Sequence, residues 1–161
     1  MLATRLVHLI ETHADSLSQT LIERLENDPH CADLRKVPEH EMKARTYEVY
    51  RNLGDWLLGK TQNEVGQIYR HLGERRAEQG VAFSHFLYAI MATKEQLWKF
   101  LEEEGMVAKP VELFGEMELF RMVDQFYDRA LYHSAVGYEQ VQGAETEAAQ
   151  QSRIHPIHRS A

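Results

Sequence analysis

The stretch VELFGEMELFRMVDQFYDRALYHSAVGYEQVQ, residues 111–142, decides the fold of this chain. It contains no proline, and most of its apolar residues recur at steps of three or four, which is the spacing of one helix face. That face consists of Leu113, Met117, Phe120, Val123, Tyr127, Leu131, Tyr138 and Val141. A second apolar set lies beside it: Phe114, Met122, Phe126 and Ala130. So wide a stripe predicts a helix that is contacted from more than one side. We therefore expect four of its residues in the core or at a subunit interface: Phe120, Tyr127, Leu131 and Tyr138.

The rest of the chain also reads as helix, with proline and glycine only at the breaks. Four further helices are predicted, over residues 3–26, 38–58, 61–80 and 84–104. Pro29 ends the first helix, and Gly59 is suited to cap the second. Thr61, with Glu64 three residues later, has the pattern of a capping box. The fold class expected is all-α, with about five main helices and a long C-terminal one.

Composition narrows the function classes. The 161 residues are enough for one domain with a real core, and 43% are hydrophobic. A net charge of −7 argues against non-specific nucleic-acid binding, which needs a basic face. No apolar run approaches the roughly 18 residues of a membrane span. The single cysteine, Cys31, cannot form an internal disulfide, which fits a reducing cytoplasm. We expect a cytoplasmic protein with no nucleic-acid or membrane partner.

After Gly143 the composition becomes polar, so residues 1–142 are predicted as the domain and residues 143–161 as a tail or linker. A single helix from residue 111 to residue 150 would span roughly 60 Å. A compact domain of this size has a diameter near 40 Å, so the helix should project from the body. Our hypothesis is that this helix transmits a signal across a dimer.

The nine histidines raise the question of a metal or haem. A metal-binding bundle needs His/Glu pairs on at least two helices. Only His71 and Glu74 form a convincing pair, so no metal site is predicted. An all-α chain of this length could also be globin-like, with His71, His85 or His133 as the haem ligand. Nothing in the local sequence distinguishes these three. We expect no cofactor, with haem or a small apolar ligand between the helices as the alternative.

Two further patterns were weighed. Arg75 and Arg76 could bind an anion, or could form ion pairs with Asp124 and Asp128 on the long helix. The acidity of the chain favours the ion pairs, and Arg76–Asp128 is the structural pair predicted. Neither a Gly-x-Ser-x-Gly motif nor a phosphate-binding glycine loop occurs in the sequence. No catalytic residue is therefore predicted.

Three motifs occur in a fixed order: LGxxRAExG at residues 72–80, FYDRAxY at residues 126–132 and GYE at residues 137–139. The first predicted helix ends in LENDP, at residues 25–29. In this order and spacing the motifs resemble the N-terminal domain of the RsbT co-antagonist proteins, the RsbR-type subunits of the stressosome. The resemblance covers roughly residues 3–142.

This resemblance implies a globin-like all-α fold, generally without haem, that forms homodimers and senses a signal in stress-response regulators. In that family the output domain is a C-terminal STAS domain, whose β/α pattern is not found in this sequence. We therefore expect either a stand-alone sensor or part of a longer regulator. Its expected partners are a second copy, an output domain or other stressosome-type regulatory proteins. No catalytic residue is implied.

Overall fold

The structure, a computed structural model, describes residues 2–104 and 110–154, and the side chains of residues 4–104 and 117–154. The elements are α1 (Leu2–Thr12), α2 (Ala14–Asn27), η1 (Pro29–Lys36), α3 (Glu39–Arg51), η2 (Asp55–Gly59), α4 (Gln62–Glu78), α5 (Phe83–Glu103) and α6 (Pro110–Ile154). Within these ranges there is no strand, so the all-α prediction with a long C-terminal helix is confirmed. The globin-like likeness is compatible with this architecture and stays a prediction.

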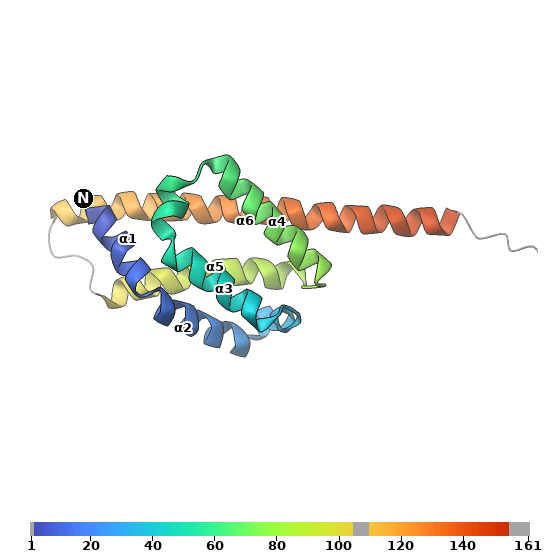
Figure 1. Cartoon of the computed structure of the whole chain (residues 1–161), viewed down its shortest axis with the longest axis horizontal. Helices are drawn as coiled ribbons and strands as arrows, with labels where there is room; N and C mark the ends of the chain where they lie inside the picture. Colours follow the sequence, from blue (N-terminus) through green and yellow to red (C-terminus); the bar gives the residue numbers. More distant parts are fainter. Residues whose placement is uncertain (1, 105–109, 155–161) are drawn as a thin grey trace, which may run out of the picture.

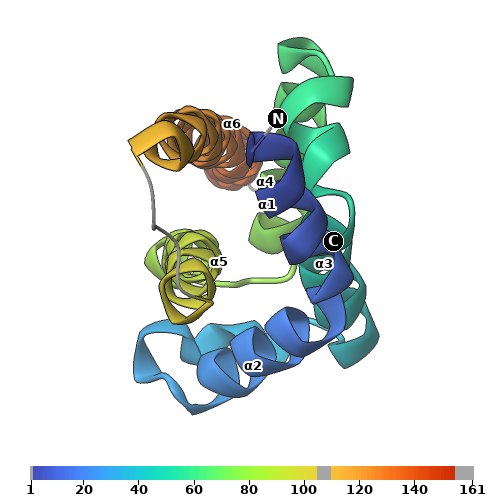
Figure 2. The ribbon, with the colours of Figure 1, turned by 90° about the vertical axis from the view of Figure 1, so that its left-hand side faces the viewer.

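Helix α6 is the axis of the molecule. It runs along the long axis of the view in Figure 1, and the other helices pack along part of it. Seen from one end, α5 and α6 lie on one side, α2 lies below, and α1, α3 and α4 form the other side (Figure 2). Leu119, Val123 and Ala130 of α6 are completely buried; Val123 and Ala130 belong to the apolar stripe that the sequence predicted, and Leu119 does not.

Helices α4 and α6 touch backbone to backbone at two glycines. A Cβ added at Gly73 would lie 2.0 Å from the carbonyl oxygen of Ser134. One added at Gly137 would lie 1.9 Å from the carbonyl oxygen of Arg70. Only a residue without a side chain fits such an approach. The glycines of the LGxxRAExG and GYE motifs are therefore the contact points of these two helices.

Two of the predicted helices are broken. The helix expected over residues 3–26 divides at His13, whose φ and ψ are −101° and 15°. The His13 ring donates from Nδ1 to the Leu9 carbonyl over 2.8 Å, and it packs on Phe100 at 5.3 Å between ring centroids. This tertiary contact holds the side chain where the backbone turns, so the local periodicity did not predict the break.

The second break follows Arg51, inside the helix expected over residues 38–58. The N–H of Gly54 donates to Oε1 of Glu11 on α1, over 3.0 Å. The chain then continues as the π-helical turn η2, closed by a bond from the Lys60 N–H to the Asp55 carbonyl. The predicted capping box at the start of α4 is confirmed, because Thr61 and Glu64 bond reciprocally.

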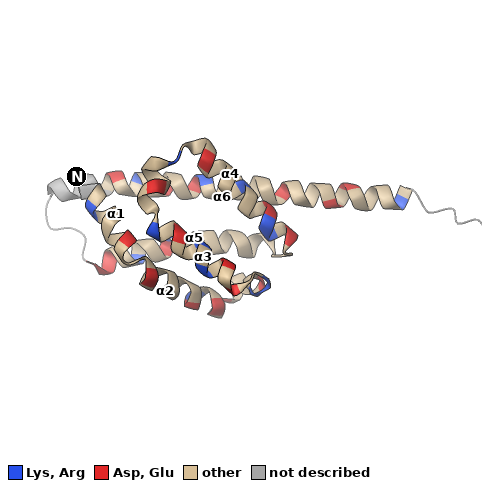
Figure 3. Cartoon of the chain, viewed as in Figure 1, with Lys and Arg blue, Asp and Glu red and all other residues tan. Residues whose placement is uncertain are grey.

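The C-terminal third of α6 leaves the body of the molecule. From Glu139 to Ile154 every side chain except Val141 is exposed, and the helix extends past all the others in Figure 1. In Figure 3 this segment shows acidic positions along its length and one basic position at its end. The predicted boundary at residue 142 thus falls inside a continuous helix and stays a prediction. Residues 155–161 of the predicted tail lie outside the described residues.

Candidate functional site

A small cavity, partly open to solvent, lies between α2, η1, α3, α4, α5 and α6. Its volume is about 60 Å³. Most of its lining is apolar: Leu25, Leu34, Met42, Val49, Leu72, Phe86, Ala89 and Ile90. The polar residues that line it are Arg45, Thr46, Tyr69, Arg76, Thr93 and Tyr127. We call this space the central cavity.

The two threonines that line the central cavity have hydrogen-bond partners. Thr46 accepts from the Ser18 hydroxyl over 3.0 Å and donates to the Met42 carbonyl. Thr93 donates to the Ala89 carbonyl over 2.9 Å. Their hydroxyls are therefore committed to the protein and are not free to hold a ligand.

Arg45 and Tyr127 differ from them. The Nε and Nη2 atoms of Arg45 and the Oη of Tyr127 are buried, and none finds a hydrogen-bond partner among the described residues. Tyr127 is only 2% exposed, and burial raises its pKa well above the usual range, so the phenol stays protonated. Unpaired buried donors are rare in proteins because each loses its hydration without a replacement. The cavity wall thus presents three donor atoms without acceptors.

Aromatic rings hold the Arg45 guanidinium in place. Its Cζ lies 5.2 Å from the centre of the Tyr69 ring and 5.9 Å from that of Trp56, which are cation–π distances. Its Nη1 lies 3.7 Å from Oε2 of Glu48. Arg45 was not among the residues predicted from the sequence, where its one local signal is its position on the same helix face as Met42 and Val49.

Arg76 is the most deeply buried charge near the cavity, with a side chain 3% exposed. Its Nη1 donates to Oε1 of Glu41 over 2.6 Å and to Oε1 of Gln79 over 2.8 Å. Arg75 also reaches Glu41, at 3.4 Å. Burial lowers the pKa of Arg76. It would raise that of Glu41, but the hydrogen bonds from the two arginines keep the Glu41 pKa below its usual value.

The predicted ion pair between Arg76 and Asp128 is wrong, because Arg76 pairs with Glu41 instead. Asp128 lies on the exposed face of α6, whereas Arg76 lies on the face of α4 that meets α3. Asp124, the other acid considered, forms an ion pair with Lys94 of α5 at 3.4 Å. Spacing along the chain cannot show which helix faces which, and that relation determines the partner.

An open groove between α3 and α4 lies outside the central cavity. Its lining is Glu41, Ala44, Arg45, Glu48, Gln67, Ile68, His71, Leu72, Arg75 and Arg76. Arg45, Leu72 and Arg76 line the groove and the cavity alike. These three side chains therefore lie between the groove and the central cavity.

The three histidines considered as haem ligands lie on three different helices, and none lines the central cavity. His71 is exposed beside Glu74, with Nδ1 3.2 Å from the carboxylate. His85 accepts a bond at Nδ1 from the Asp33 N–H over 3.1 Å. His133 is half-buried against Gly66, and burial together with two arginines lowers its pKa. The haem alternative gains no support from these positions and stays untested.

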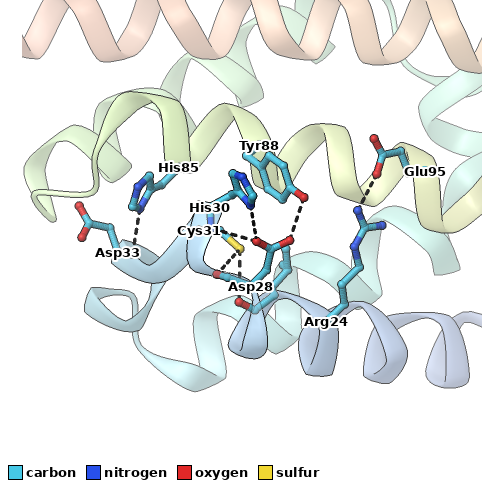
Figure 4. Close-up of polar contacts among 9 residues, drawn as sticks. Arg24, Asp28, His30, Cys31, Asp33, His85, Tyr88 and Glu95 are labelled. Atoms are coloured by element: carbon cyan, nitrogen blue, oxygen red, sulfur yellow. Dashed lines mark hydrogen bonds and ion pairs between the residues drawn. The ribbon is translucent and has the colours of Figure 1, made fainter.

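Figure 4 shows how η1 is attached to α5. Asp28 accepts from the His30 N–H over 2.9 Å and from the Tyr88 hydroxyl over 2.8 Å, which lowers its pKa to about 2. Cys31 is buried at the same place, and burial raises the pKa of its thiol. A thiol of that kind is unreactive. This cluster has a structural role.

The four residues expected in the core or at an interface divide into two pairs. Tyr127 and Tyr138 are buried in the core, and the Tyr138 hydroxyl donates to the Val81 carbonyl over 2.6 Å. Phe120 and Leu131 are half-buried. Phe120 meets the Trp98 ring edge to face at 4.9 Å. Only the second pair remains accessible to a partner.

Among the described residues, no group of three or more histidine, cysteine or acidic side chains is arranged to hold a metal ion. No helix in the same ranges is both long and apolar enough to span a bilayer.

Comparisons with known proteins support the resemblance seen in the sequence. The family model described as the RsbT co-antagonist protein rsbRD N-terminal domain matches residues 11–153, from the end of α1 almost to the end of α6. No curated protein and no solved structure matches the chain. The matched part includes the central cavity, both glycine contacts and the projecting segment of α6. The chain therefore belongs to the family of RsbT co-antagonist rsbRD N-terminal domains, a regulatory family of stress signalling.

Proposed function

We propose that this chain is a non-enzymatic sensory domain of a stress-response regulator in the cytoplasm, which acts as a homodimer and passes its signal along α6. The family supports the regulatory part of this proposal. The main structural support is the double character of α6. Its middle is the centre of the core, and its last turns extend into solvent. A rearrangement of the core that moves the middle of α6 would therefore also move its exposed C-terminal end.

Residues 143–161 would then connect the domain to its downstream partner, either an output domain or another stressosome-type regulatory protein. The segment from Gly143 to Ile154 is helical and exposed. A helix without a break conveys a displacement more directly than a flexible linker does.

The dimer surface that we propose is the outer seam between α5 and α6. Lys94 pairs with Asp124, and Trp98, four residues later on α5, meets Phe120, four residues earlier on α6, edge to face. Both pairs fit the same antiparallel register of α5 and α6. In that register Leu87 of α5 comes opposite Leu131 of α6. We call Leu87, Met91, Trp98, Met117, Phe120 and Leu131 the α5–α6 face.

This face is unusually apolar for an exposed surface. Met91 is 46% exposed and Met117 is 55% exposed. The charges beside them, Lys94 and Asp124, neutralise each other. Soluble oligomers are most often symmetric dimers that use the same surface on both copies. A second copy would place two such seams together as a four-helix bundle, with the two α6 helices in the interface.

Met91→Glu tests this proposal. Met91 is already partly in water, so the variant should fold, yet it places two carboxylates in the interface. We expect wild type to elute as a dimer in size-exclusion chromatography with light scattering, and the variant to elute as a monomer. Leu58→Glu, at a site 70% exposed on η2, is the matched control and should leave the dimer intact. A Met91→Glu protein that stays dimeric would exclude this face.

A further inference from the structure

The chemistry of the central cavity specifies the kind of molecule that fits it. Two of its lining residues carry buried polar atoms without a partner among the described residues: Nε and Nη2 of Arg45, which can only donate, and the hydroxyl of Tyr127, which is able to donate. Of the two acids beside this wall, Glu41 is bonded to Arg76 and Arg75. The other, Glu48, lies 3.7 Å from Nη1 of Arg45, which leaves Nε and Nη2 of that guanidinium without an acceptor in the described part of the chain. The complement of such a wall is an acceptor with negative charge, because hydrogen bonds to charged groups are the strongest that a buried donor can form.

The remainder of the cavity excludes a purely polar ligand. Most of the other lining residues are apolar, among them Leu25, Leu34, Met42, Phe86 and Ile90. A volume of about 60 Å³ holds roughly four or five non-hydrogen atoms, since one water-sized sphere needs about 10–15 Å³. We propose that the central cavity binds a short-chain monocarboxylate, with its carboxylate on Arg45 and Tyr127 and its alkyl group among the apolar side chains.

The groove between α3 and α4 provides the entry. Arg45, Leu72 and Arg76 separate it from the cavity. Arg76 is held by Glu41 and Gln79, whereas the charged partner of Arg45 among the described side chains is Glu48, at 3.7 Å. Arg45 stays against the Tyr69 and Trp56 rings and lines both spaces, so its guanidinium would attract an anion from the groove towards the cavity.

This inference rests on the proposed sensory function for its meaning, although binding can be measured without it. Arg45 belongs to α3 and Tyr127 to α6. A carboxylate bonded to both would tie α3 to the helix that leaves the body. The ligand would then act on the position of α6 directly.

The probe for binding is sodium propionate, observed by NMR of the intact chain with ¹³C-methyl methionine. Of the methionines whose side chains the structure describes, only Met42 lines the central cavity, and Met91 lies exposed on α5. We expect propionate to shift the Met42 signal in a saturable way and to leave that of Met91 in place. Propionamide, which lacks the charge, and sodium chloride, which lacks the alkyl group, should bind at least tenfold more weakly.

Two variants test the assigned donors. Tyr127→Phe removes one buried hydroxyl without changing the ring, and Arg45→Met keeps an apolar side chain of similar length. Each should weaken propionate binding about tenfold or more. Tyr132→Phe, at an exposed tyrosine of the same helix, should not change it. Tyr127→Phe should also unfold no more easily than wild type, because it loses an unpaired polar atom, so weaker binding would not reflect a damaged fold.

Three results would overturn the proposal. They are no shift of Met42, a shift of equal size with chloride or propionamide, and unchanged affinity in both variants. Dimerisation, measured on the same samples, reports separately on the proposed function. If a monomeric protein binds propionate, the proposed ligand site is supported and the proposed dimer is contradicted. If the protein is a dimer and does not bind propionate, the dimer is supported and the ligand site is contradicted.

Discussion

Asp28 shows how much a single side chain contributes to this fold. The carboxylate accepts bonds from the first turn of η1 and from Tyr88 on α5 at once. The sequence predicted only that a helix ends there, since Pro29 disfavours helix in the residue before it. The bond to Tyr88 joins residues 60 positions apart. No local pattern contains that information.

The pKa of about 2 gives a prediction for Asp28→Asn. Because the folded-state pKa lies below the ordinary value of 3.8, the carboxylate stabilises the fold above about pH 4. That contribution is lost as the pH falls towards 2. We expect urea unfolding to show a smaller loss of stability between pH 4 and pH 2 in Asp28→Asn than in wild type. Asp128→Asn, at an exposed acid of α6, should behave as wild type does. Equal losses in all three proteins would contradict the assignment.

At the scale of elements, the crossing of α4 and α6 is the closest helix contact in the described part of the chain for which glycines are responsible. Gly137 lies against the Arg70 carbonyl, whereas Gly143, six residues further along the same helix, has nothing within 4 Å of an added Cβ. Both glycines lie inside the same helix, but Gly137 packs against another backbone and Gly143 faces open space. This difference allows a matched pair of substitutions.

Gly137→Ala should destabilise the protein by about 1–3 kcal/mol, because the methyl group forces two backbones apart. Gly143→Ala should stabilise it by about 0.5–1 kcal/mol, since alanine is the better helix former and meets no neighbour. The measurement is the free energy of unfolding from urea titrations followed by circular dichroism. If the two substitutions change stability in the same direction, α4 and α6 do not touch at this point.

At the scale of the whole molecule, α6 has 45 residues, or about 67 Å at 1.5 Å per residue. The compact part of a chain of this size is only about 40 Å across. One end of α6 must therefore leave the body, and Figure 1 shows that it is the C-terminal end. The side chains of residues 143–154 are all exposed, so packing against other helices does not slow hydrogen exchange in this segment.

Hydrogen exchange should divide α6 into two parts. Amides from Leu119 to Tyr138 lie in the core and should exchange only with global unfolding, whereas those from Gly143 to Ile154 should exchange orders of magnitude faster by fraying. Mass spectrometry of peptides from the two segments measures both rates in one sample. Equal protection would mean that a partner covers the projecting segment, and the α5–α6 face would then not be the whole interface.

The sequence by itself determined the helical class, the presence of a long C-terminal helix, the capping box at Thr61 and the family. These features depend on periods of three to four residues and on motifs of a few neighbouring positions, which are local. Only the tertiary structure decided that Arg76 pairs with Glu41, that the first helix breaks at His13, and that Arg45 and Tyr127 line the same cavity. Each of these depends on which face of one helix meets which face of another, and residues far apart in the chain determine that packing together.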